Sequence, residues 1–511
     1  MKVVNLMNFV RQIDEREPDS TRRLLEMTTR QLRLANEYGV DNTFLLQYDA
    51  LCDQSIVSLF QHEATEKTEL GLWYEIVEPL TTACGIPYRS EQGWKWDWHI
   101  IPGFSMAYTP HQREHLIDEA MRKFRETFGC YPRTVASWLI DTHTLNYLSR
   151  HYDIRCVAIC RDQANTDAYT LLGGYFSQAY YPSQNNIFTP AQSPLLQTDV
   201  PVFRLLGPCP IHNHDNNRYS SEAVKALGRR SACFTLEPCW YMGSTPEITQ
   251  WMFDTFYSQE SLGFAYAQIG QENSFFPSMD QVLEGTQMQI RQLLSRGDVS
   301  FRKMSDTGDA FRTRYPHGTP ATSVVALSNW DTTDVQSVYY DCKNYTANLF
   351  RYEETVFLRS LYLFDERVKD RYLEDTCTSF DAVYENLPIV DTMPCDDKDR
   401  KNCGLIIDSQ GGPFEAKAVS EGVLEISFGD RSVIFFEDRI EIRAARLTLC
   451  SNSLRAKVQI CPQGLALSYN GTNYQLATEG ARINRSGREI ILEATGDKIC
   501  LFPRKQNAAH R

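Results

Sequence analysis

Apolar runs that end abruptly in polar residues recur along the first 310 residues of the chain. The most pronounced joins the apolar run 264–267 (FAYA) to the polar run 271–274 (QENS), as expected of a strand buried on both faces. The run 231–236 passes into Glu237 in the same way. Side chains at the carboxyl ends of neighbouring parallel strands converge on one crevice. The pattern therefore predicts that Glu237 and Glu272 lie close together.

Strand-like and helix-like patterns alternate over this part of the chain, which predicts a parallel sheet closed into a complete or partial barrel. Gly39 ends the helix expected at 20–38, and Pro110 opens the helix expected at 110–128. The other expected strands lie at 1–11, 43–49, 69–75, 134–140, 155–160 and 202–206.

The pattern changes near residue 319, where runs such as 337–340 indicate antiparallel strands. A charged connection ends near residue 401, and short alternating strands with Gly and Asn turns then continue to residue 502. We predict a catalytic barrel over 1–315, a linking region of mixed strands and helix over 316–400 and a β-sandwich-like domain over 401–511. The expected fold class is α/β with a C-terminal antiparallel β-domain.

Composition narrows the classes of partner. At 511 residues the chain is longer than a domain with a single hydrophobic core usually is. Its formal charge of −13 argues against nucleic acid and anionic membrane surfaces as partners, and favours a neutral or cationic substrate.

No apolar run reaches the roughly 20 residues that span a bilayer. The first residues resemble a strand rather than a secretory leader. The 15 scattered cysteines suit a reducing compartment, so we expect a cytoplasmic protein; a homo-oligomer stays open.

The segment 68–77 (TELGLWYEIV) occupies the place of the "HEIGxHxxxH" metal motif of polysaccharide deacetylases. Thr68, Trp73 and Val77 stand where that motif has histidines, and the aspartate pair expected near Arg11 is missing. With the order of the elements, this segment resembles the glycoside hydrolase/deacetylase superfamily. The resemblance implies an irregular, seven- or eight-stranded β/α barrel, appended β-domains and activity on carbohydrate, without the usual deacetylase metal site.

Two carboxyl groups are the usual requirement for glycoside hydrolysis: one protonates the leaving oxygen and the other is a nucleophile or base. Adjacent parallel strands lie about 4.8 Å apart. Carboxylates at their ends can therefore have the separation of either a retaining or an inverting glycosidase. Glu237 and Glu272 are the leading pair, with roles unassigned. Each would otherwise cap a helix or form a structural ion pair.

Three further carboxylates follow expected strands. Asp141 follows the fourth strand, where it could equally cap a helix, and Asp162 follows the fifth. Glu75 lies close to Trp73, and a carboxyl buried beside an indole has a raised pKa, as a general acid requires.

Aromatic residues are dense in two loops. Exposed rings stack on sugar faces and loop amides bind hydroxyls, although such aromatics are more often part of the core. The first loop carries Trp94, and the second carries Tyr175, Gln178, Tyr180, Asn185 and Asn186. The expected substrate-binding residues are Trp73, Trp96, Asp97, Trp98, His99, Trp138, His143 and Tyr181.

No metal or other cofactor is expected. A divalent metal is the alternative, held by Asp97 and His99 with Asp141 or His143, or by the patch His212, His214 and Asp215. The sequence carries no phosphate loop, serine-hydrolase elbow or HExxH motif. The leading function is a glycosidase acting on an oligosaccharide or glycoside. The alternatives are a divergent metal-dependent carbohydrate deacetylase and a non-catalytic carbohydrate-binding protein.

Overall fold

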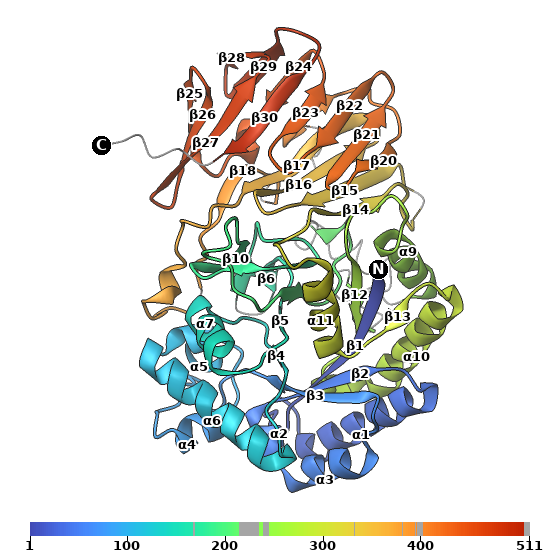
Figure 1. The fold of residues 1–511 in the computed structure, drawn as a ribbon, viewed down its shortest axis with the longest axis vertical. Coiled ribbons are helices and arrows are strands. Elements are labelled where there is room, and N and C mark those ends of the chain that lie inside the picture. The colour runs from blue at the N-terminus through green and yellow to red at the C-terminus, as the bar shows by residue number, and fades with distance from the viewer. Residues whose placement is uncertain are drawn as a thin grey trace.

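The computed structural model describes residues 1–166, 169–213, 235–238, 245–331, 333–380, 382–393, 395 and 402–504. A β/α barrel forms one half of the molecule, and antiparallel β-sheets form the other half (Figure 1). The predicted fold class is therefore confirmed. Within the part of the chain that the structure describes, no helix combines the length and apolarity needed to cross a bilayer.

The barrel sheet has the strand order β12-β1-β2-β3-β4-β5-β11-β8, with β13 beside β1. Neighbours from β12 through β11 pair in parallel, and β8 pairs antiparallel with β11. The predicted strand 231–236 lies mostly outside the described residues. The strands are β1 (Lys2–Val10), β2 (Asn42–Leu46), β3 (Thr68–Trp73), β4 (Thr134–Ala136), β5 (Cys156–Ile159), β8 (Ala179–Tyr180), β11 (Val202–Arg204), β12 (Ala265–Ile269) and β13 (Ser300–Phe301).

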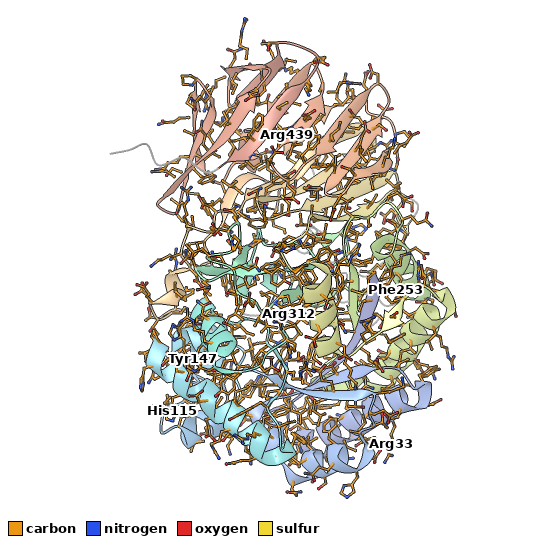
Figure 2. The ribbon with its side chains drawn as sticks, viewed as in Figure 1. Arg33, His115, Tyr147, Phe253, Arg312 and Arg439 are labelled. Atoms are coloured by element: carbon orange, nitrogen blue, oxygen red, sulfur yellow. The ribbon has the colours of Figure 1, made fainter. Side chains whose placement is uncertain are left out.

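Helices surround the barrel, and their ends follow sequence signals. Thr109 and Gln112 form a capping box at the start of α6, and Gly129 ends this helix in the left-handed conformation. In Figure 2, Arg33 of α1 and His115 of α6 lie on this outer ring. The helices are α1 (Ser20–Tyr38), α2 (Tyr48–Cys52), α3 (Gln54–Glu63), α4 (Glu78–Ala83), α5 (Ile100–Gly103), α6 (Pro110–Phe128), α7 (Thr142–His151), α9 (Pro246–Phe256), α10 (Met279–Arg296) and α11 (Met304–Arg314).

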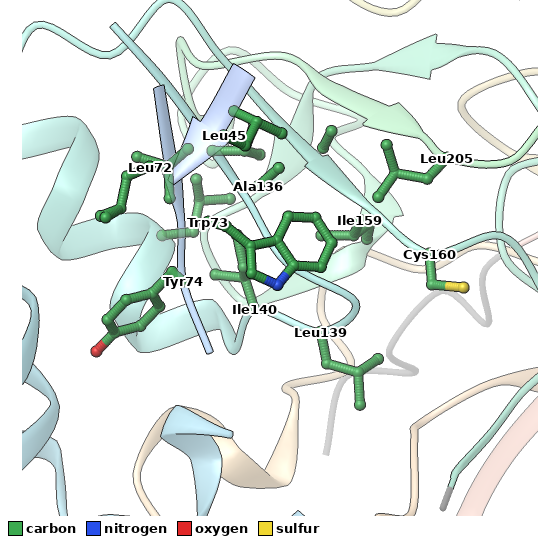
Figure 3. Close-up of a cluster of buried hydrophobic side chains, with 14 of the residues drawn as sticks. Leu45, Leu72, Trp73, Tyr74, Ala136, Leu139, Ile140, Ile159, Cys160 and Leu205 are labelled. Carbon is green, nitrogen blue, oxygen red and sulfur yellow. The ribbon is translucent and has the colours of Figure 1, made fainter. Parts of the chain in front are cut away.

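The barrel interior is packed with apolar side chains, and Trp73 lies at its centre (Figure 3). Its ring stacks on Phe9 of β1, with ring centroids 4.2 Å apart. Gly71 gives this layer room, because a Cβ there would lie 2.7 Å from the side chain of Leu45. The described part of the interior is thus a filled core.

Two antiparallel sheets form the rest of the molecule and bury a shared core between them. The first has the order β14-β15-β16-β17-β19-β24-β29-β28, with β18 also paired to β17. Because β17 pairs with β19 as well, this sheet runs across the predicted division at residue 400. Its strands are β14 (Thr322–Ala326), β15 (Val335–Asp341), β16 (Tyr345–Tyr352), β17 (Thr355–Leu363), β18 (Leu387–Asp391), β19 (Leu405–Asp408), β24 (Arg446–Leu449), β28 (Ala481–Ser486) and β29 (Glu489–Ala494).

The second sheet has the order β20-β21-β22-β23-β30-β27-β26-β25. Its strands are β20 (Glu415–Ser420), β21 (Val423–Phe428), β22 (Arg431–Phe435), β23 (Ile440–Arg443), β25 (Lys457–Cys461), β26 (Gly464–Tyr469), β27 (Thr472–Glu479) and β30 (Ile499–Arg504). Two small sheets lie between β5 and β11 in the sequence. They consist of β6 (Gln163–Thr166) with β7 (Tyr169–Leu171), and β9 (Pro182–Ser183) with β10 (Asn186–Pro190).

Candidate active site

A cleft of about 360 Å³ lies at the carboxyl ends of the barrel strands. Arg11 follows β1, Trp138 follows β4 and Glu272 follows β12, so three strand ends contribute to its wall. The remaining wall comes from the loop after β1 and from the segment between β3 and α6. The lining residues are Arg11, Arg16, Trp96, Trp98, Phe104, Trp138 and Glu272.

Glu272 reaches the cleft because of the turn at Gly270. Gly270 has a φ of 105°, and a Cβ at this position would lie 2.0 Å from the carbonyl oxygen of Met7 on β1. Only glycine permits this close approach. Arg11 Nη2 donates to Glu272 Oε2 at 2.5 Å, and Ser274 Oγ donates to Oε1 at 2.5 Å. Both oxygens therefore accept short hydrogen bonds from neighbouring side chains.

Glu75 lies beyond the end of β3 and is buried. The N–H groups of Tyr74 and Ile76 donate to Ala136 O and Gly103 O, which fixes the backbone on both sides of it. Trp96 Nε1 donates to Glu75 Oε2 at 2.9 Å, and Oε1 has no hydrogen-bond partner among the described residues. Burial raises the pKa of Glu75 to about 6, against the opposing charge of Arg11.

Arg11 connects these two carboxylates. Its guanidinium carbon lies 4.0 Å from the centre of the Trp96 ring, which bonds Glu75, while its Nη2 bonds Glu272. In the sequence, Arg11 stands only where an aspartate pair is missing, so it was not among the predicted site residues. It nevertheless shares the pattern of Glu272, a charged residue directly after a buried run, and this pattern could have identified it.

Glu237 is not among the described residues that line the cleft. Thr235 Oγ1 and Gln271 Nε2 donate to its carboxylate at 2.9 and 3.0 Å, and burial raises its pKa. Gln271 Oε1 accepts the backbone N–H of Glu272 at 2.8 Å. Glu237 therefore lies behind Glu272, joined to it through Gln271. The predicted neighbours are connected, but only Glu272 faces the cleft.

Asp141 takes the alternative role that the sequence left open, a helix cap, and it is not among the described residues that line the cleft. It caps α7 by accepting the N–H of Thr144 at 3.0 Å, and it forms an ion pair with Arg113 at 3.0 Å. Ser105 Oγ also donates to it. Burial opposes ionisation of Asp141, but Arg113 and these donors outweigh it, so its pKa lies below the ordinary value.

Asp162 lies at the junction with the β-sheets rather than in the cleft. Arg204 Nη2 and the N–H of Gly174 donate to its carboxylate at 2.7 and 2.8 Å. It lines a separate cavity of about 30 Å³ with residues such as Tyr362 and Asp391. This volume is too small for a sugar.

Three of the predicted substrate-binding residues, Trp96, Trp98 and Trp138, do line the cleft. Trp73 lies beneath it, in the barrel core. Tyr181 is also a core residue, packed against Phe311 at a ring distance of 5.3 Å. The expectation that these two contact substrate is therefore corrected.

The polar members of the predicted set bond to protein groups. Asp97 Oδ1 lies 2.6 Å from His99 Nδ1, and Ser90 Oγ donates to Asp97 Oδ2, so this pair shapes its own loop. His143 on α7 lies 3.0 Å from Glu114 on α6. The hydroxyl groups of Tyr175 and Tyr180 donate to Pro320 O and Ile187 O. Gln178, Asn185 and Asn186 are not among the described cleft residues either.

The residues present do not fit a deacetylase metal site. At the motif positions, Trp73 and Val77 are buried apolar residues, and Arg11 places a cation at the end of β1. Among the described residues, no group of three or more His, Cys, Asp or Glu could hold a metal ion. His212 lies beside Asn329 and Trp330. His214 and Asp215 lie outside the described residues.

No protein-family model and no curated protein match the sequence. Among solved structures, a candidate glycoside hydrolase/deacetylase from Parabacteroides distasonis matches with a TM-score of 0.57 and 14% identity, over 78% of this chain and 93% of that one. This chain therefore shares the fold of that structure. The resemblance seen in the sequence is thus confirmed at the level of fold. A candidate polysaccharide deacetylase from Mycobacterium smegmatis matches with a TM-score of 0.35 and 10% identity, over 61% of this chain and 91% of that one.

Proposed function

We propose that this protein is a glycoside hydrolase in which Glu75 is the general acid and Glu272 is the ionised nucleophile or base. The supporting observation is that two carboxylates with opposite environments lie on either side of one wall of the cleft: Glu272 lines the cleft, and Glu75 is buried behind Trp96, bonded to its indole N–H. Glu75 is buried, which favours its protonated form, and Glu272 is held by Arg11 and Ser274. Glu75 takes the place of Glu237 in the pair proposed from sequence.

The cleft suits a sugar ring. Trp96, Trp98 and Trp138 offer apolar faces for C–H groups. Glu75 gives its proton to the glycosidic oxygen as the bond to the anomeric carbon breaks. Glu272 either attacks that carbon or takes a proton from the water that attacks it. The first route retains the anomeric configuration and the second inverts it.

The proposed reaction needs no metal. This is supported by the residues present, because Arg11 and aromatic rings occupy the positions where a deacetylase has metal ligands. Activity is expected to survive exhaustive treatment with EDTA. Loss of activity with chelator, restored by a divalent ion, would instead support the deacetylase alternative.

The test is a comparison of Glu75→Gln, Glu272→Gln and Glu237→Gln on a panel of aryl glycosides. We expect the first two variants to lose at least about 10²-fold in kcat. Glu75→Gln should lose least with the best leaving group, because such a group needs no proton. Circular dichroism and melting temperature would show whether each variant is folded.

Glu237→Gln is the matched control, since it makes the same change in a buried carboxylate behind the cleft. A loss with Glu237→Gln as large as that with Glu272→Gln, and none with Glu75→Gln, would restore the pair proposed from sequence. Sugar binding by the wild type without turnover, over long incubation with the whole panel, would support the non-catalytic alternative.

A further inference from the structure

Arg11 is anchored at the junction of the first and last barrel strands. Its backbone N–H donates to Asn273 Oδ1 at 3.1 Å, and Asn273 Nδ2 donates back to Arg11 O at 2.8 Å. This reciprocal pair joins the end of β1 to the segment that carries Glu272. The backbone of Arg11 and the backbone next to Glu272 are therefore fixed relative to each other.

The Arg11 side chain lies between the two carboxylates of the proposed mechanism. One face of its guanidinium covers Trp96 at 4.0 Å, and its Nη2 bonds Glu272 at 2.5 Å. Trp96 in turn bonds Glu75 at 2.9 Å. Only 4% of the Arg11 side chain is exposed, so water screens its charge weakly.

The other charges near Arg11 have their own partners. Asp49, which follows β2, accepts the N–H groups of Gln12 and Ile13 at 2.7 and 2.6 Å. Asp14 forms two hydrogen bonds with Arg16, at 2.9 and 2.6 Å. Arg11 itself forms an ion pair with Glu272 and lowers the pKa of Glu75.

We propose that Arg11 is a positioning residue that couples Glu272 to Glu75: it fixes the Glu272 carboxylate by a buried ion pair and, through the Trp96 ring, fixes Glu75 behind the wall of the cleft. This inference rests on the proposed function. Without the guanidinium, the Glu272 charge would act on Glu75 uncompensated and favour protonation of Glu75. Arg11 Nη1 has no hydrogen-bond partner among the described residues, which leaves a buried donor beside the cleft.

The first test is the pH dependence of kcat/KM for Arg11→Met and Arg11→Lys. The charge of Arg11 lowers the pKa of Glu75, so the limb of the profile that Glu75 sets should move to higher pH in Arg11→Met. Arg11→Lys keeps the charge and should return this limb toward the wild-type position. We expect kcat to fall by about 10²-fold in Arg11→Met, with a smaller change in KM.

The second test needs no turnover. Protonation of Glu75 changes its hydrogen bond with Trp96, so tryptophan fluorescence should titrate with a midpoint near pH 6, and Trp96→Phe should abolish this transition. In Arg11→Met the midpoint should rise. Arg16→Met is the matched control, because Arg16 also lies over the Trp96 ring, at 4.8 Å, but is bonded to Asp14; it should shift the midpoint less.

The outcomes separate the two proposals. A raised fluorescence midpoint in Arg11→Met without cleavage of any glycoside by the wild type would uphold the coupling and overturn the glycosidase. Glycoside cleavage with an unchanged pH profile and midpoint in a folded Arg11→Met, or in the equally uncharged Arg11→Gln if the methionine variant does not fold, would overturn the coupling alone.

Discussion

Trp96 donates its indole N–H to Glu75 Oε2 at 2.9 Å, from a loop that follows β3 and folds back over its end. One residue therefore supplies both an aromatic wall of the cleft and a polar contact to the proposed acid. The hydrogen bond stabilises the ionised form of Glu75 and so limits the effect of burial on its pKa.

Trp96→Phe should therefore raise the pKa of Glu75 and move the alkaline limb of kcat/KM upward from about pH 6. Trp98→Phe is the control, since Trp98 lines the same cleft and stacks on His99 instead. It should change KM without moving the limb. Equal displacement of the limb in both variants would show that loss of aromatic surface, not of the hydrogen bond, sets the pKa.

Glu75 should make the protein less stable as pH rises. Its pKa in the folded state is about 6, above its ordinary value of 4.5, so between these values the folded state holds more protons than the unfolded state. Stability is therefore lost through this window, by up to about 2 kcal/mol at 1.36 kcal/mol per pH unit. Glu75→Gln should remove this loss and unfold at higher urea concentration than wild type at pH 7. No gain at pH 7 relative to pH 4.5 would contradict the assigned environment.

Asp141→Asn should cost stability rather than chemistry. The substitution leaves the buried Arg113 without its anion, a change that costs about 3 to 5 kcal/mol. Urea unfolding would measure this loss, and activity per folded molecule should stay near wild type. Glu126→Gln, which removes an exposed ion pair with Arg122, should cost less than about 1 kcal/mol. A stable Asp141→Asn variant without activity would return Asp141 to the catalytic candidates.

Local pattern was sufficient to predict β1 to β5, β11 and β12 of the barrel sheet, but not the short strand β8, which lies in a segment expected to be a loop. The helices expected at 20–38 and 110–128 have these bounds in α1 and α6, because local residues set their ends: Gly39 ends α1, and the Thr109 capping box and Gly129 bound α6. The pairing of β17 with β19 across residue 400 depends on contacts between distant residues, which no local pattern contains.

The site was predictable only in part for the same reason. A carboxylate after a buried run can face the cleft, as Glu272 does, or lie behind it, as Glu237 does, and the sequence near both looks alike. Trp73 and Trp96 are likewise indistinguishable by residue type. The alternation of side chains along the strand places Trp73 inside the barrel, whereas the loop that carries Trp96 places this residue over Glu75.

Gly270→Ala should disable the site by moving Glu272. The new Cβ would lie 2.0 Å from Met7 O, a backbone atom of β1 that cannot move without disturbing the sheet. The chain must shift at the turn, and Glu272 then loses its alignment with Arg11; a misplacement of about 1 Å can cost 10²-fold in rate. Gly129→Ala is the matched control: Gly129 also has a positive φ, of 80°, but nothing lies within 4 Å of its Cβ position. It should cost only about 1 kcal/mol of stability and leave kcat unchanged. If Gly270→Ala kept wild-type kcat, the turn would not be what positions Glu272, and the proposed pairing of this carboxylate with Arg11 would lose its structural basis.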